Sequence, residues 1–284
     1  MPSCPVVDTH VHFLNHEKFR YPWIDEVPAL GKPFLLEDYQ RETEGMNIAT
    51  MLFMQCDCEW SSSLDEVRWV TDLAREEKRL RGIISHAPIE KGDGCRSFLE
   101  ELSTIPLVRG VRRLIQSEPD LEFCVQPDFL RGLEVLTEFE MSFDICIYHV
   151  QLGSVLQMVE RSPSVSFILD HIAKPDIKHG VMHPWGAQIK RLSEFPNVVC
   201  KISGMLTEAD HENWTRDELK PYIDHVIDCF GFDRVVYGGD WPVSTMAGGY
   251  AAWMGALEWA LEGCSEGDLR KFFSENAERV YRLG

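Results

Sequence analysis

The stretch VVDTHVHFLNH, residues 6–16, opens the pattern that decides the fold. It has the composition of a strand, and it carries His10 and His12 two positions apart. Since side chains alternate between the two faces of a strand, these imidazoles point the same way, about 7 Å apart. This arrangement suits a shared ligand or a metal ion, where a purely structural strand would carry Val or Leu. A short H-x-H motif also arises by chance, so it needs support from the rest of the chain.

Seven similar apolar runs follow the first one. Most of them are apolar on both faces, as buried parallel strands are. Helical patterns separate them, and two of these open on capping-box signatures, Ser63 with Glu66 and Thr215 with Glu218. The predicted strands span residues 5–13, 47–55, 81–89, 106–115, 142–150, 164–172, 197–205 and 233–243.

Eight strand–helix repeats predict an α/β fold, a single (β/α)8 TIM barrel that occupies residues 1–284. The competing architecture is a doubly wound open sheet, which would usually carry a glycine-rich phosphate loop after its first strand. Here the residues after Phe13 are Leu-Asn-His-Glu-Lys, so the barrel is favoured.

The composition narrows the class of partner. The formal net charge is −18, from 28 basic and 46 acidic residues. We expect neither nucleic acid nor an anionic membrane as a partner, because both require a basic face. No signal peptide opens the sequence, no apolar stretch reaches the ~20 residues of a membrane span, and the nine cysteines lack paired spacing. We expect reduced thiols, a cytoplasmic location and a small-molecule substrate, and the sequence leaves a homo-oligomer open.

Active sites of such barrels form at the C-terminal ends of the strands. Three imidazoles, of His10, His12 and His149, together with the carboxylate of Asp240 would form a site for one Zn²⁺ or Mn²⁺ ion. The alternative is that the histidines are buried imidazoles bonded to backbone carbonyls. The candidates gathered at the predicted strand ends are His10, His12, His86, Arg112, Arg113, His149, His171, Lys174, Asp240 and Trp241.

Two sets of candidates leave alternatives open. Arg112 and Arg113 are adjacent on a strand, so they face opposite ways, and the parity of the strand favours Arg112 in the barrel mouth. Tyr21 and Trp23, in the long loop after the first strand, could stack on a ring-shaped ligand, as could Trp241. A hydrophobic plug that packs this loop against the barrel explains these aromatic side chains equally well.

A series of longer motifs runs through the chain in order: DTHVHF (8–13), YHVQLG (148–153), LDHIAKP (169–175), PNVVCKISGMLTEA (196–209), YGGDWPV (237–243) and NAERVYRL (276–283). This series resembles the amidohydrolase superfamily, most closely its lactonase branch, which contains L-fuconolactone and L-rhamnonolactone hydrolases and the lactonase of pyrone dicarboxylate. The similarity covers essentially the whole chain.

The resemblance implies a (β/α)8 barrel hydrolase whose site positions fall on His10, His12, His149, His171 and Asp240. Many relatives bind one divalent metal ion through such residues, and some lactonases of this branch work without metal. Strand four offers Arg112 and Arg113 in place of the carboxylated lysine that bridges two metals in other branches. A binuclear centre is therefore not expected.

The activity expected from the resemblance is the opening of a sugar-acid lactone by water. Asp240 is the candidate general base, and His171 would orient the water or hydrogen-bond the carbonyl. His86, Lys174, the two arginines and the aromatic side chains would contact the substrate. The acidic chain favours a neutral polyhydroxylated lactone over a dianionic one. The alternatives are a metal-dependent decarboxylase of an aromatic or unsaturated carboxylic acid, and a non-catalytic barrel that only binds a ligand.

Overall fold

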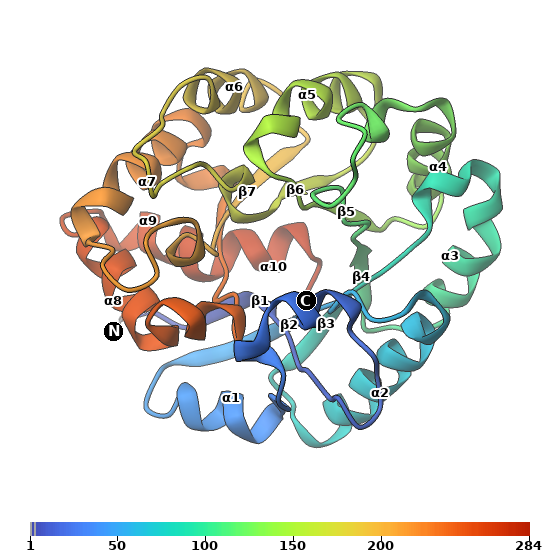
Figure 1. Ribbon diagram of the computed structural model, residues 1–284, viewed down its shortest axis with the longest axis horizontal. Helices are drawn as coiled ribbons and strands as arrows, with labels where there is room; N and C mark the ends of the chain where they lie inside the picture. Colours follow the sequence, from blue (N-terminus) through green and yellow to red (C-terminus); the bar gives the residue numbers. More distant parts are fainter. Residues whose placement is uncertain (1, 3) are drawn as a thin grey trace.

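The computed structural model describes residue 2 and residues 4–284. Its centre is one parallel sheet of eight strands that follow one another in chain order. Helices surround this sheet as an outer ring (Figure 1). The predicted (β/α)8 barrel is confirmed. The strands are β1 (Val6–Val11), β2 (Ile48–Met54), β3 (Leu80–Ser85), β4 (Val108–Val111), β5 (Ser142–Ile145), β6 (Phe167–Leu169), β7 (Val198–Ile202) and β8 (Val235–Tyr237).

The barrel closes between its first strand and the segment that follows its last. Val11 forms a parallel bridge with Trp241, and the backbone N–H of His12 donates to the carbonyl of Trp241 at 2.7 Å. The N–H of Asp240 donates to the carbonyl of His10 at 2.8 Å. These bonds place the histidines of the first strand beside the segment of Asp240, which follows the last strand.

Among the described residues the protein has ten α-helices, and α10 lies near the centre of the ring instead of in it (Figure 1). One of the two predicted caps forms. At α7, the carboxylate of Glu218 accepts the N–H of Thr215 at 2.7 Å, as a capping box requires. The prediction at Ser63 is wrong, because a 3-10 turn (Trp60–Ser62) runs directly into α2 and the Ser63 hydroxyl donates to the carbonyl of Trp60. The helices are α1 (Leu36–Glu42), α2 (Ser63–Glu76), α3 (Arg96–Ser103), α4 (Pro127–Thr137), α5 (Leu152–Arg161), α6 (Trp185–Leu192), α7 (Arg216–Phe230), α8 (Gly249–Ala260), α9 (Glu266–Arg270) and α10 (Asn276–Val280).

The C-terminal segment closes one end of the barrel. Alternate strand residues form an apolar cluster that also takes in Tyr281 and Leu283. The guanidinium of Arg282 donates to the carbonyl of Arg109, near the start of β4, at 3.1 Å. Figure 1 accordingly places α10 and the C-terminus near the centre of the ring. Because the tail covers the N-terminal ends of the strands, the opposite ends remain for a functional site.

Several strands end earlier than predicted. β5 ends at Ile145 instead of 150, and β8 ends at Tyr237 instead of 243. Polar residues just beyond the strands leave the extended conformation, and His171 and Asp240 have positive φ angles of 52° and 53°. No helix within residues 4–284 combines the length and the apolar character needed to cross a bilayer.

Candidate active site

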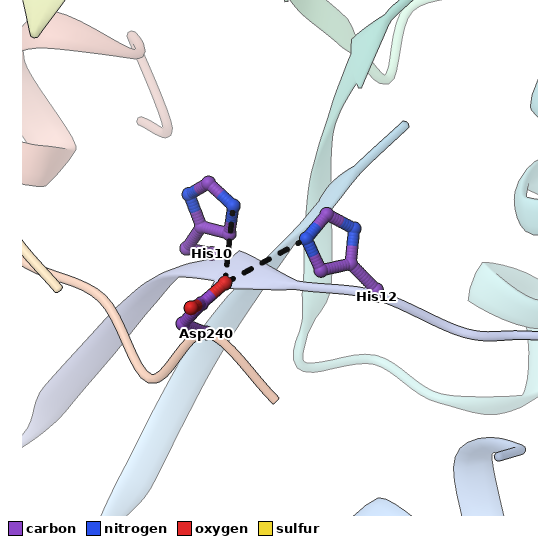
Figure 2. Close-up of side chains that lie close together, drawn as sticks. All are labelled: His10, His12 and Asp240. Atoms are coloured by element: carbon purple, nitrogen blue, oxygen red, sulfur yellow. Dashed lines mark ion pairs between the residues drawn. The ribbon is translucent and has the colours of Figure 1, made fainter. Parts of the chain in front are cut away.

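Three side chains from the two ends of the sequence meet at one point. The Nε2 atoms of His10 and His12 lie 3.6 and 3.8 Å from Oδ1 of Asp240. Figure 2 shows the two imidazoles approaching the carboxylate from β1 and the end of that strand. All three residues are buried. The sequence prediction that His10 and His12 share one side is confirmed by these contacts.

The backbone turn at Asp240 explains why glycine precedes it at position 239. Asp240 has φ 53°, in the left-handed region, which turns its side chain back over β1. Gly239 donates its N–H to Oδ1 of Asp8 at 2.7 Å, and a Cβ at Gly239 would lie 2.5 Å from Oδ2 of the same carboxylate. Only glycine therefore fits between Asp8 and the turn that carries Asp240.

A hydrogen bond on the far side of the His12 imidazole sets its tautomer. His12 Nδ1 lies 2.8 Å from the carbonyl of Met54, so Nδ1 carries the proton and Nε2 is an acceptor. Both nitrogens of His10 lie near donors, because Nη1 of Arg112 is 3.3 Å from Nε2 and Nζ of Lys201 is 3.4 Å from Nδ1. The free lone pair of His12 therefore faces the carboxylate of Asp240, while Arg112 shares Nε2 of His10 with that carboxylate.

This donor set fits one divalent cation. Two imidazoles with one carboxylate are ligands that Zn²⁺ accepts, and a bound ion would compete with Arg112 for Nε2 of His10. His10, His12 and Asp240 offer atoms within 4.8 Å of one another, as do His10, Asp170 and His171. In the second group Asp170 already pairs with Lys201 at 2.8 Å and with Arg112 at 3.2 Å, so the first group is the better site for an added cation.

His171 approaches the same carboxylate from β6. Its Nε2 lies 4.0 Å from Oδ1 of Asp240, and its Nδ1 lies 2.8 Å from the Ser203 hydroxyl. A Cβ at Gly204 would lie 2.5 Å from Nδ1 of His171, which accounts for the Ser-Gly pair after β7. The fold therefore places His171 next to Asp240, as the sequence predicted.

The two adjacent arginines turn to different environments. Arg112 is buried against His10 and Asp170, and it lines the central cavity described below. Arg113 instead pairs with Glu90 and Glu118 and lies over the ring of Phe123. Arg112 is therefore the arginine of the site, and the prediction that Arg113 contacts the substrate lacks support from its position.

A buried charge network beneath the site was missed by the sequence analysis. Nζ of Lys201, on β7, lies 2.8 Å from Oδ2 of Asp144 and 2.8 Å from Oδ1 of Asp170. Asp170 also lies 3.2 Å from Nη1 of Arg112, and Tyr281 donates to Asp144. The signal was present in the sequence, because a lysine and an aspartate inside apolar strands need each other to be buried.

Burial determines the charge states of the site. It lowers the pKa of His12 to about 3, with help from Arg112, and it holds the pKa values of His10 and His171 well below their usual range. The imidazoles are thus neutral at pH 7, and their contacts with carboxylates are not ion pairs. Burial also raises the pKa of Asp240 to about 7. Although burial opposes it, the ammonium of Lys201 and the His10 ring hold the pKa of Asp170 well below its usual range.

The carboxylate of Asp240 lines an open cavity with a volume of about 150 Å³. A concave site with apolar walls and a few convergent polar groups is typical of small-molecule binding. Among the predicted contact residues, Trp23, Arg112, His171 and Lys174 lie in its wall. The other lining residues are His12, Cys56, Asp57, Leu114, Gln116, Ser117, Cys146, Thr207 and Val243.

Besides Arg113, four predicted site residues lie elsewhere. Since β5 ends at Ile145, His149 begins a separate 3-10 turn (His149–Gln151), where its Nδ1 contacts the carbonyl of Lys174, and it joins neither group of metal-binding atoms. His86 packs against Trp60 in a second cavity.

The remaining two are core aromatics. Tyr21 is fully buried and accepts the N–H of Asn15. Trp241 packs against Phe13, Phe34 and Tyr39. Both belong to the hydrophobic plug, the alternative that the sequence left open, and neither lines the central cavity.

Comparisons with known proteins agree with this geometry. Residues 7–283 match the protein family described as Amidohydrolase. An L-fucono-1,5-lactonase of Burkholderia ambifaria is 30% identical, with 98% of this chain and 95% of that protein covered. An L-rhamnono-gamma-lactonase of Scheffersomyces stipitis is 22% identical over the full length of both. The crystal structure of a Burkholderia multivorans amidohydrolase with bound zinc superposes with a TM-score of 0.89 at 25% identity, covering 99% of this chain and 100% of that one.

Proposed function

The chain belongs to the amidohydrolase family, and from that premise we propose that it hydrolyses the lactone ring of a neutral sugar acid. The observation that carries this proposal is the carboxylate of Asp240, which lies among neutral imidazoles in the wall of an open cavity. The names of the lactonase relatives support the substrate class.

Asp240 has the properties of a general base for the attacking water. A pKa of about 7 leaves a large fraction of the carboxylate ionised at neutral pH and basic enough to accept a proton. The neutral rings of His12 and His171, both in the cavity wall, can hold the water against Oδ1 of Asp240. Fixing the water in this way removes much of the entropic cost of its attack.

Attack forms a C–O bond and turns the lactone carbonyl into an oxyanion. Arg112 supplies a permanent positive charge at this end of the cavity, and its Nε–H has no hydrogen-bond partner among the described residues. Lys174 adds a second cation to the same wall. Preorganised donors of this kind stabilise an oxyanion more than water does.

Collapse of the oxyanion breaks the bond to the ring oxygen. Asp240, now protonated, returns its proton to that oxygen as it leaves as an alcohol. The product is an open hydroxy acid, which releases one proton at neutral pH. His10 does not line the cavity. Its role is to hold Asp240 and Arg112 in place through its contacts with both side chains.

The metal site adds to this chemistry when it is filled. His10, His12 and Asp240 would hold the ion, and a bound divalent cation lowers the pKa of water and polarises a carbonyl.

The proposal is tested with a panel of aldonolactones of both ring sizes, including L-fucono-1,5-lactone, with proton release as the readout. Each lactone is assayed with and without a chelator, so that any contribution of an ion is measured separately. Hydrolysis of at least one sugar lactone with kcat/KM above about 10⁴ M⁻¹s⁻¹ supports the proposal. Release of CO₂ from aromatic acids, without opening of any lactone, would select the decarboxylase instead.

A further inference from the structure

Asp57 occupies an unusual position in the wall of the central cavity. It follows the end of β2 by three residues and has a φ of 53°, in the left-handed region. Its N–H donates to the side-chain oxygen of Gln55, which fixes the turn. Aspartate adopts this conformation more readily than most residues.

The carboxylate of Asp57 makes no hydrogen bond and no ion pair among the described residues, and it is only partly exposed. The charges of Arg112 and Arg113 act on it from a distance, and its oxygens are open to solvent. Its acidic neighbour Glu90, by contrast, pairs with Arg113. A ligand hydroxyl that donates to Asp57 would take the place of water on this carboxylate, which leaves it available as an acceptor at the cavity wall.

Asp57 is also the residue that two cavities share. It lines the central cavity together with Arg112 and Lys174, and it lines the second cavity together with His86 and Trp60. The second cavity has a volume of about 390 Å³ and a wider mouth. A group that Asp57 binds therefore lies at the edge of the central cavity, away from the contacts of Asp240 with the imidazoles.

We propose that Asp57 accepts hydrogen bonds from ring hydroxyl groups of the lactone and so selects polyhydroxylated, uncharged substrates. This inference rests on the proposed lactonase function and names its substrate class. A carboxylate offers only acceptors, and its two oxygens match a pair of neighbouring hydroxyls. The same charge repels a substrate that carries its own carboxylate at this position.

The test compares two substrates that differ in their hydroxyl groups, L-fucono-1,5-lactone and unsubstituted δ-valerolactone. Asp57→Gly removes the side chain and tolerates the positive φ, whereas Asp57→Asn keeps the shape and removes the charge. Glu90→Gln, an acid-to-amide change in the wall of the second cavity only, is the matched control. Thermal unfolding of each variant checks that the barrel is intact.

For Asp57→Gly we expect kcat/KM on the hydroxylated lactone to fall by about 10- to 100-fold, the effect of losing hydrogen bonds to a charged group. On δ-valerolactone the variant should stay within about 3-fold of the wild type, because that lactone makes no such bonds. On the hydroxylated lactone, the kcat/KM of Asp57→Asn should lie between those of the wild type and Asp57→Gly. Glu90→Gln should match the wild type on both lactones. Equal losses on both lactones, or no loss on either, would overturn the inference.

Binding of L-fucose, a neutral pyranose that cannot be hydrolysed, separates this inference from the proposed function. Calorimetry should give a dissociation constant about 10-fold or more weaker for Asp57→Gly than for the wild type. Unchanged sugar binding would contradict the role of Asp57 whether or not lactones turn over. A wild type that binds the sugar through Asp57 but opens no lactone would contradict only the proposed function.

Discussion

The ammonium of Lys201 lies 2.8 Å from Oδ1 of Asp170, and neither side chain is exposed. The same ammonium lies 2.8 Å from Asp144, so one buried cation serves two buried carboxylates. Asp170 in turn contacts both Arg112 and His10, which connects this network to the site above it. The position of the catalytic groups therefore depends on charges inside the barrel.

Removing this cation should destabilise the fold strongly. Lys201→Met leaves two carboxylates buried without compensation, and we expect a loss of about 3–5 kcal/mol in the free energy of unfolding, measured with urea. Lys178→Met, which removes the more exposed pair with Asp210, is the control and should cost less than about 1 kcal/mol. Similar small losses for both variants would show that Lys201 does not stabilise the barrel.

The two neighbouring arginines should differ in their effect on turnover. Arg112→Met removes the cation next to the reacting carbonyl, and we expect kcat/KM on a sugar lactone to fall by about 10²- to 10³-fold. Arg113→Met removes a cation that pairs with Glu90 and Glu118 outside the central cavity, so its activity should stay near that of the wild type. A larger loss for Arg113→Met than for Arg112→Met would reverse this assignment.

Glu66 should make the stability of the protein depend on pH. Burial raises the pKa of this carboxyl to about 8, from 4.5, and its Oε1 has no hydrogen-bond partner among the described residues. The folded state then binds the proton more tightly than the unfolded state, so stability falls as the pH rises from about 4.5 to 8.

Glu66→Gln removes this dependence. The variant should match the wild type near pH 4.5 and exceed its free energy of unfolding by an amount on the order of 4 kcal/mol at pH 9. Urea denaturation at both pH values measures the difference. A difference that does not change with pH would contradict the raised pKa.

Metal binding should be limited to one ion. Because Asp170 in the second group of candidate ligands already pairs with Lys201 and Arg112, titration with Zn²⁺ should saturate at one equivalent per chain. His12→Gln should weaken the affinity by about 10-fold or more, while His179→Gln, at an exposed position paired with Asp176, should leave it unchanged. Two equivalents of zinc, or no binding at all, would contradict the fit of this donor set.

The sequence predicted the parts of the site that follow from the barrel itself. His10, His12, His171 and Asp240 were found because parallel strands bring their C-terminal ends together. His149 was placed with them on the same reasoning, which failed because β5 ends four residues before it and the chain turns away. Strand length depends on packing against neighbours, which a single sequence does not reveal.

Other features of the site depend on tertiary contacts. The aromatic side chains of Trp23 and Tyr21 are equivalent by composition, yet only Trp23 lines the central cavity. Their difference lies in how the loop after β1 folds over the barrel. Lys201 and Asp144 could have been paired as opposite charges within apolar strands, but the contact of Lys201 with Asp170 required the register of β6 and β7.

The most direct test of the account is the kcat/KM of Asp240→Asn on the sugar lactone that the wild type opens fastest. Loss of a general base should lower this value by about 10²- to 10⁴-fold. Binding of L-fucose should persist, because the cavity keeps its shape. A variant that retains more than about a tenth of the wild-type kcat/KM would contradict the role of Asp240, and with it the proposed mechanism.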